Sequence, residues 1–307
     1  MPSKVPARRH NIRAADHIQV LWSAYMVEKR TTGRRKEDTR SLPVSSSLPP
    51  QFTEKQERMF VDAMEALNAG EVSYAVSGAF ALHEHTGIWR NTKDLDLFLQ
   101  SSEVPKALKV LEKCGYKGEV TDPVWLAKAW RDGYFVDLIT GMSNAVLRVD
   151  QSWMERSIPA TVLGVETCVL PAEELIASKI FVTRRERFDG ADVAHLIYAN
   201  RDELDWERMY ALVGDHWEML LWSLIFYRYV YPRHAHEIPR SVWHELLEKF
   251  ERDLMDPKLD APFRGSLIDE NMFAIDVQEW GHENEIERYR QQHRQLRIKR
   301  ARKDPAA

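Results

Sequence analysis

Two aspartates lie one residue apart in the apolar run "DLDLF" at residues 94–98. In a β-strand, side chains at positions i and i+2 point to the same face, so Asp94 and Asp96 would project together. Carboxylates about 6–7 Å apart on one strand face repel each other unless a cation lies between them. Such a pair suits Mg²⁺, which binds through one or two carboxylates and the phosphates of a substrate. A strand that exposes two aspartates to solvent is the alternative.

The residues around this pair could handle a phosphate. The run "SYAVS" predicts a short strand that ends at Gly78, and "AFALHEH" predicts the start of a helix. Backbone N–H groups at such a helix N-terminus can bind an anion, and glycine allows its close approach. Arg90 and Thr92 precede the acid pair, and the apolar run "YFVDLIT" supplies a further acid, Asp137.

The stretch "YAVSGAFALHEHTGIWRNTKDLDLFL" resembles the signature of the nucleotidyltransferase superfamily, which has the DNA polymerase β-like fold. That signature is a strand, a Gly-Gly or Gly-Ser turn, a short helix, and then Arg-x-Thr-x-Asp-hydrophobic-Asp on the next strand. The family also has a third acid on a later strand. The matching residues in this chain are Gly78, Ala79, Arg90, Thr92, Asp94, Asp96 and Asp137.

A second stretch, "PAEELIASKIFVTRRERFDGADVAHLI", resembles the helical segment of antibiotic-resistance-type and AbiEii-like members of that superfamily. In those members Pro-Glu opens a helix that carries a lysine, and Arg-x-Asp-x-x-Asp follows. The matching positions are Pro171, Glu173 or Glu174, Lys179, Arg187, Asp189 and Asp192. The resemblance covers about residues 55 to 200, and the two motifs in order are more specific than either alone.

The resemblance implies an enzyme that depends on Mg²⁺ or Mn²⁺ and moves an NMP group from an NTP, such as ATP, to a hydroxyl-bearing acceptor. The acceptor could be a small molecule, a tRNA or a protein. The implied metal ligands and catalytic residues are Asp94, Asp96 and Asp137. The implied nucleotide-binding residues are Ser77, Gly78, Ala79, Arg90, Thr92 and Lys179.

Several alternatives stay open at this point. The family has a glycine or small polar residue where this chain has Ala79. Alanine keeps its backbone N–H but has no hydroxyl group, and the hydroxyl of Ser77 could make that contact instead. A nucleotide-binding protein with weak catalysis is therefore a rival interpretation, as is a toxin-like regulatory protein that works beside a partner protein. Lys179 could bind phosphate or extend to solvent. Asp189 and Asp192 could pair with the arginines at 184, 185 and 187 or orient the active site.

The elements that would position these residues follow from periodicity and capping. Residues 54–69 predict a helix with Thr53 as N-cap, Gln56 three residues later and Gly70 at its end. The order helix, strand, helix, strand, helix, strand, strand predicts a mixed α/β (α+β) sheet with flanking helices, as in nucleotidyltransferases. In this scheme "VPKALKVLEKCGY" is a helix with Cys114 turned inward, and "ATVLGVETCVL" is one strand.

Composition shifts predict four regions. Residues 1–50, rich in charge, Ser and Pro, predict a flexible N-terminal arm, either a solvated tail or a weak contact with RNA or DNA. Residues 51–170 predict the α/β domain and 171–257 a helical domain, with the ligand cleft at their junction. Residues 258–307 predict an aperiodic segment that wraps against the core as a loop, and a charged C-terminal helix or tail.

The composition excludes other classes. The formal net charge of −4 does not indicate a nucleic-acid-binding protein, and two cysteines are too few for a disulfide framework. A cytoplasmic location is the simplest interpretation. We expect no membrane association, because the most hydrophobic stretch, 217–231, is shorter than the ~20 residues of a spanning helix and contains Glu218 and Arg228. The N-terminus has no apolar run typical of a secretory signal.

Overall fold

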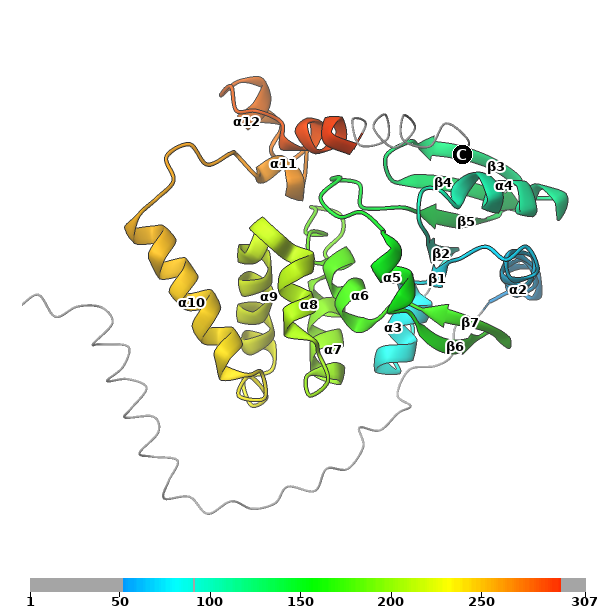
Figure 1. Ribbon diagram of the computed structural model, residues 1–307, viewed down its shortest axis with the longest axis horizontal. Helices are drawn as coiled ribbons and strands as arrows, with labels where there is room; N and C mark the ends of the chain where they lie inside the picture. The colour runs from blue at the N-terminus through cyan, green and yellow to red at the C-terminus, as the bar shows by residue number, and fades with distance from the viewer. Residues whose placement is uncertain (1–51, 91, 294–307) are drawn as a thin grey trace, which may run out of the picture. The chain divides into compact units, whose positions relative to one another are not determined.

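The computed structural model describes residues 52–90 and 92–293 (Figure 1). These residues all belong to one compact unit. The predicted arm at 1–50, position 91 and the end of the predicted C-terminal tail lie outside the described residues.

One mixed sheet of seven strands has the order β3-β4-β5-β2-β1-β7-β6. The β5–β2 and β1–β7 pairs are parallel, and the other neighbouring pairs are antiparallel. The strands are β1 (Ala75–Val76), β2 (Asp94–Phe98), β3 (Lys117–Asp122), β4 (Leu126–Arg131), β5 (Tyr134–Ile139), β6 (Ile158–Val162) and β7 (Val165–Val169). This sheet confirms the predicted α/β class.

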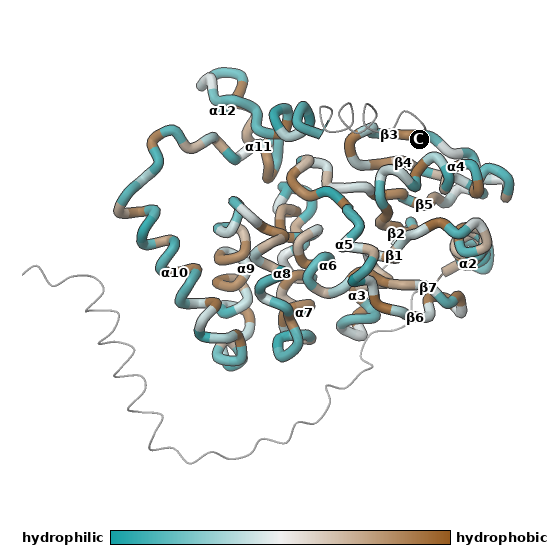
Figure 2. Tube along the Cα trace, in the orientation of Figure 1, coloured by the Kyte–Doolittle hydropathy of each residue, from teal (hydrophilic) through white to brown (hydrophobic). Residues whose placement is uncertain are grey.

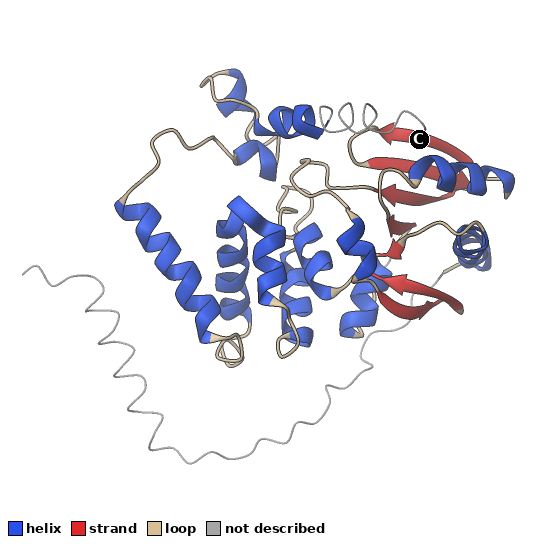
Figure 3. Ribbon diagram, in the orientation of Figure 1, coloured by secondary structure: helices blue, strands red, loops and turns tan. Residues whose placement is uncertain are grey.

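Helices flank the sheet and then follow it (Figure 3). The first group is α2 (Glu54–Ala69), α3 (Gly78–Thr86), α4 (Val104–Lys113) and α5 (Gln151–Glu155). The second group is α6 (Ala172–Lys179), α7 (Gly190–Asn200), α8 (Trp206–Val213), α9 (Trp217–Val230) and α10 (Arg240–Met255). Two short helices, α11 (Gly265–Ile268) and α12 (Ala274–Gln278), follow α10.

Helix α2 forms as its sequence predicts. The Thr53 hydroxyl accepts a hydrogen bond from the backbone N–H of Gln56 at 3.1 Å, which satisfies one of the free donors of the first turn. One apolar face of α2 packs into the core, with Phe60, Met64 and Leu67 fully buried.

Side chains alternate along β2 and β5, so the aspartates lie on one face of the sheet and the core leucines on the other. Leu95, Leu97 and Leu138 join the large core cluster that also contains the buried face of α2. The intervening residues of both strands point to the opposite face. Phe98 on that face stacks on Trp153 of α5, with ring centroids 5.8 Å apart. The acids of these strands therefore lie on the face opposite α2.

Three local predictions were wrong. Strands β3 and β4 were not predicted, because most side chains of β3 are exposed and its alternation of apolar residues is weak. The run "ATVLGVETCVL" forms the β6–β7 hairpin, whose turn at Leu163 and Gly164 has backbone φ angles of 49° and 81°. Cys114 is exposed, because α4 ends at Lys113 and the chain turns there.

The region after the sheet is helical. Every residue of α6 is buried, and α7 and α8 pack against it, while α9 packs against α7. Figure 2 shows hydrophobic and hydrophilic residues mixed along these helices. The segment predicted as a loop after residue 258 instead contains α11 and α12, with Leu267 buried. Across residues 52–90 and 92–293, no helix is both long and apolar enough to cross a membrane.

Candidate active site

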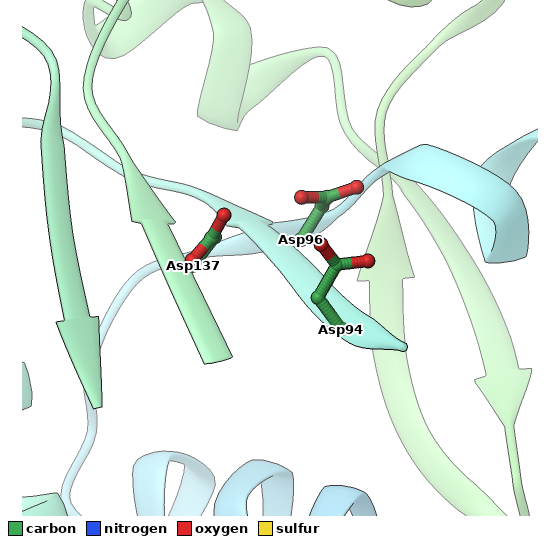
Figure 4. A group of neighbouring side chains, drawn as sticks. All are labelled: Asp94, Asp96 and Asp137. Carbon is green, nitrogen blue, oxygen red and sulfur yellow. The ribbon is translucent and has the colours of Figure 1, made fainter. Parts of the chain in front are cut away.

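Three aspartates converge on two neighbouring strands, and we call Asp94, Asp96 and Asp137 the acid cluster (Figure 4). Each contributes one carboxylate oxygen to a group in which all the oxygens lie within 4.8 Å of one another. Within the described part of the chain, this is the one group of three His, Cys, Asp or Glu side chains close enough to share a metal ion.

Parallel pairing of β2 with β5 creates this arrangement. Asp96 lies directly opposite Asp137 in the register, and Asp94 lies opposite Phe135. Asp94 and Asp96 share a face because they are two residues apart on one strand. The third acid, 41 positions after Asp96 in the sequence, reaches them only through this pairing.

The electrostatics of the acid cluster are unfavourable to three ionised carboxylates. Burial, together with the charges of Asp94 and Asp137, raises the pKa of Asp96 to about 7, although Lys179 and Arg187 oppose the shift. Burial also raises the pKa of Asp137, against the lowering effect of Lys128. A cation bound between the acids would relieve both effects.

Lys128, a residue that the sequence analysis missed, contacts the acid cluster from β4. It lies opposite Asp137 in the β4–β5 register, and its Nζ donates to both carboxylate oxygens of Asp137 at 2.7 and 3.0 Å. The signal that could have found it is the alternation in "LAKAW", which puts the lysine between two apolar neighbours of a strand.

The turn between β1 and α3 touches the acids. Gly78 has a backbone φ of +58°, and a Cβ atom there would lie 2.0 Å from Oδ2 of Asp96. Glycine is required for both reasons, conformation and space. Ser77 is buried, and its backbone N–H donates to the carbonyl of Asp96 at 2.8 Å. Ala79 follows in the first turn of α3, partly exposed.

Arg90 and Thr92, the two residues implied to bind nucleotide just before β2, have different partners. The Thr92 hydroxyl donates to Oδ1 of Asp94 at 2.6 Å, so Thr92 orients a member of the acid cluster. The Gln56 side chain donates to the Thr92 carbonyl at 3.0 Å and holds this turn against α2. Arg90 instead donates to Oδ1 of Asp192 at 3.1 Å.

A second charged group lies beside the acids, and we call Arg90, Lys179, Arg187, Asp189 and Asp192 the paired cluster. Lys179 is buried at the end of α6 and donates to Asp189 at 2.9 Å and to Asp192 at 3.0 Å. Arg187 makes two hydrogen bonds to Asp189, at 2.9 and 3.0 Å. Burial alone would raise the pKa of Asp189, but these bonds lower it below its usual range.

The paired cluster also acts on the acids. The charges of Lys179 and Arg187 both lower the pKa of Asp96. The two sequence motifs, more than 80 residues apart between Asp96 and Lys179, therefore meet at one site. Of the six residues implied to bind nucleotide, Ser77, Gly78 and Thr92 touch the acid cluster directly, and Lys179 reaches it electrostatically.

The glutamates at the start of α6 have other partners. Glu173 accepts a hydrogen bond from the backbone N–H of Asp205 at 2.7 Å, and Glu174 accepts one from Arg208 at 2.8 Å. Both bonds fasten α6 to the N-terminal end of α8. Burial raises the pKa of Glu174 even though Arg208 opposes the shift.

The acid cluster fits a hard divalent cation. Its donors are carboxylate oxygens alone, the ligand type that Mg²⁺ and Mn²⁺ prefer over softer sites of nitrogen or sulfur. Burial and the neighbouring acids raise the pKa of Asp96 to about 7 despite Lys179 and Arg187, so a bound cation would stabilise the ionised form.

Comparison with known proteins identifies a family. Residues 57–237 match the model of a family described as "Nucleotidyltransferase of unknown function (DUF6036)". The chain matches no curated protein sequence.

Three solved structures illustrate the structural similarity. The antibiotic-resistance factor ANT(2'')-Ia shares 13% identity at a TM-score of 0.41, over 60% of this chain and 100% of its own. The lincomycin-bound lincosamide antibiotic adenylyltransferase LnuA shares 19% identity at a TM-score of 0.34, over 47% of this chain and 96% of its own. An antigenic nucleotidyltransferase-like protein from Paracoccidioides brasiliensis shares 16% identity at a TM-score of 0.38, over 63% of this chain and 99% of its own.

Proposed function

We infer the reaction from the fact that this chain belongs to the DUF6036 family of nucleotidyltransferases. The proposed reaction moves an NMP group from an NTP to a hydroxyl group of an acceptor and depends on Mg²⁺ or Mn²⁺. The observation that carries the proposal is the convergence of three carboxylates within 4.8 Å on one sheet face. We assign the reaction to the cytoplasm, because both cysteines are free thiols.

In this proposal Asp94 and Asp96 hold the divalent cation. When bound, the cation neutralises charge on the triphosphate and polarises the phosphoryl group for attack. Thr92 fixes the carboxylate of Asp94 by its 2.6 Å hydrogen bond, so this ligand is oriented before the metal arrives. Asp137 either shares a second cation with the other acids or acts directly as general base.

The nucleotide phosphates would lie against the start of α3. The first N–H groups of a helix lack partners within the helix, and they favour negative charge. Gly78 and Ala79 present these groups beside Asp96. Lys179 and Arg187 add positive charge near Asp96, as their lowering effect on its pKa indicates. Arg90 contributes to nucleotide binding indirectly, through its hydrogen bond to Asp192, which also accepts one from Lys179.

The chemical step is an in-line displacement at the α-phosphorus. A bond forms between the acceptor oxygen and the α-phosphorus while the bond from that phosphorus to the bridging oxygen of the β-phosphate breaks. Pyrophosphate leaves with the electron pair. Asp137 receives the hydroxyl proton in the general-base version of the reaction.

The test is transfer of label from an α-labelled NTP, in Mg²⁺ buffer, to acceptors in a cell extract. Wild-type protein should label an acceptor, and Asp94→Asn should lower the rate by about a thousandfold or more, since a ligand aspartate supports several kcal/mol of transition-state stabilisation. Asp253→Asn, an exposed aspartate on α10, is the matched control and should keep the wild-type rate.

The same experiment separates catalysis from nucleotide binding alone. A protein that binds Mg²⁺–NTP, detected by a thermal shift, but labels nothing with any of the four NTPs would be a binding module. Equal labelling by wild type and Asp94→Asn would remove the acid cluster from the reaction.

A further inference from the structure

We propose that Lys128 takes the place of a second metal ion, so that the acid cluster works with one divalent cation and one ammonium group. This inference rests on the proposed function and decides between the two roles that it leaves to Asp137.

The sheet register puts Lys128 where a second cation would bind. Asp96 on β2 lies opposite Asp137 on β5, which in turn lies opposite Lys128 on β4. The three side chains therefore form one row across adjacent strands, on the same face. In the row, Asp137 has a carboxylate neighbour on one side and an ammonium neighbour on the other.

Lys128 occupies both oxygens of Asp137. Its Nζ lies 2.7 Å from Oδ1 and 3.0 Å from Oδ2, so the ammonium is centred on the carboxylate. The same Nζ lies 4.2 Å from the centre of the Phe135 ring, a cation–π contact. Phe135 is two residues before Asp137 on β5, so the lysine is held by two groups of one strand.

The position of this ammonium conflicts with a second dication. In a two-metal site the ions lie about 3.5–4 Å apart and share carboxylates. Each oxygen of Asp137 still has a lone pair that could accept a proton, but a second dication bound there would lie close to the ammonium, a like charge. By contrast, one ammonium and one divalent cation balance the charge of three carboxylates.

The divalent cation and the Lys128 ammonium would then have different roles. Asp94 and Asp96 would hold the divalent cation, which would neutralise charge on the triphosphate. Asp137 remains the group that receives the acceptor proton, and Lys128 is a positioning residue that keeps its carboxylate oriented. The proton leaves the hydroxyl oxygen and forms an O–H bond on Asp137 as the new bond to phosphorus forms.

The test counts Mn²⁺ ions bound per full-length chain, by electron paramagnetic resonance, in the presence of an NTP analogue that cannot be cleaved. Wild type should bind one Mn²⁺ and Lys128→Met two, because loss of the ammonium opens Asp137 to a metal ion. Lys128→Arg keeps the positive charge and should bind one. Lys117→Met, an exposed lysine on β3, is the matched control and should also bind one.

Two results would overturn the inference. Two ions on wild type would show that the lysine and a second metal coexist, and this result does not depend on how any variant folds. One ion on a folded Lys128→Met, with circular dichroism like the wild type, would show that the lysine excludes nothing. If wild type binds neither Mn²⁺ nor the analogue, the proposed function itself fails, which is a different outcome.

Discussion

The acid cluster and the paired cluster are built from similar residues but differ in their internal charge balance. In the paired cluster, Lys179 bonds two aspartates and Arg187 bonds one of them twice. In the acid cluster, Lys128 is bonded to Asp137, while burial and the charges of Asp94 and Asp137 raise the pKa of Asp96. In the paired cluster, each negative charge has a hydrogen-bonded cation within the cluster. In the acid cluster, the negative charges outnumber the one bonded cation.

This difference separates two roles within one site. Charges that are matched by hydrogen-bonded partners stabilise the fold around the acids and lower the pKa of Asp189. Burial and the charges of Asp94 and Asp137 raise the pKa of Asp96, and a bound cation would stabilise its ionised form. Stability and ligand binding should therefore respond in opposite ways to substitutions in the two clusters.

The largest effect on stability should come from the paired cluster. Lys179→Met leaves the buried Asp189 and its neighbour Asp192 without a shared cation. Removing one partner of a buried ion pair costs up to about 3–5 kcal/mol, and we expect a loss up to this size in urea denaturation, since Arg187 still bonds Asp189. The free energy of unfolding should be measured in EDTA, so that no metal contributes.

Arg90→Met is the comparison within the same cluster. The Arg90 side chain is 43% exposed, and an exposed ion pair contributes at most about 1 kcal/mol. A loss for Lys179→Met no larger than that for Arg90→Met would contradict the assignment of Lys179 as the central buried cation.

A smaller effect of opposite sign should come from the acid cluster. Asp96→Asn removes a carboxylate that is buried and repelled by two other acids, so the metal-free protein should become more stable by about 2–4 kcal/mol at pH 8, at about 1.4 kcal/mol per pKa unit. Chemical denaturation in EDTA at several pH values measures this. With Mn²⁺ and an NTP analogue the order should reverse, because the wild type alone retains its full set of ligands.

The pH dependence follows from the raised pKa. Between the unfolded value near 3.9 and the folded value of about 7, the folded wild type holds more protons than the unfolded chain. Its stability therefore falls as the pH rises through this window. The advantage of Asp96→Asn should shrink toward zero near pH 4, and an advantage that does not change with pH would argue against the shifted carboxyl.

The smallest effect on stability, about 1–2 kcal/mol, is expected at the turn before α3. Gly78→Ala should cost this much through its left-handed backbone, and it should also abolish Mn²⁺ binding because the new Cβ displaces Asp96. Gly164→Ala is a matched control, since it has a φ of +81° and an added Cβ would have no neighbour within 4 Å. It should cost no more than Gly78→Ala, because only its backbone is strained, and it should bind Mn²⁺ normally.

Several features of the fold could be predicted from local sequence because their causes are local. The Thr53 cap and the buried face of α2 depend on residues within one helix, and both are found. The shared face of Asp94 and Asp96 depends only on the two-residue period of a strand. The β6–β7 hairpin escaped prediction because its left-handed turn is made by Leu163, a residue type that does not indicate such a turn.

The sequence by itself determined which residue types were available: two acids on one strand, a glycine between strand and helix, and a second motif with Lys179, Asp189 and Asp192. Tertiary structure decided which charges meet. The parallel pairing of β2 with β5 brings Asp137 beside Asp96, and the antiparallel addition of β4 brings Lys128 onto Asp137. Strand pairing joins residues far apart in sequence, and the pKa values follow from those distances and from burial, neither of which is a local property of the chain.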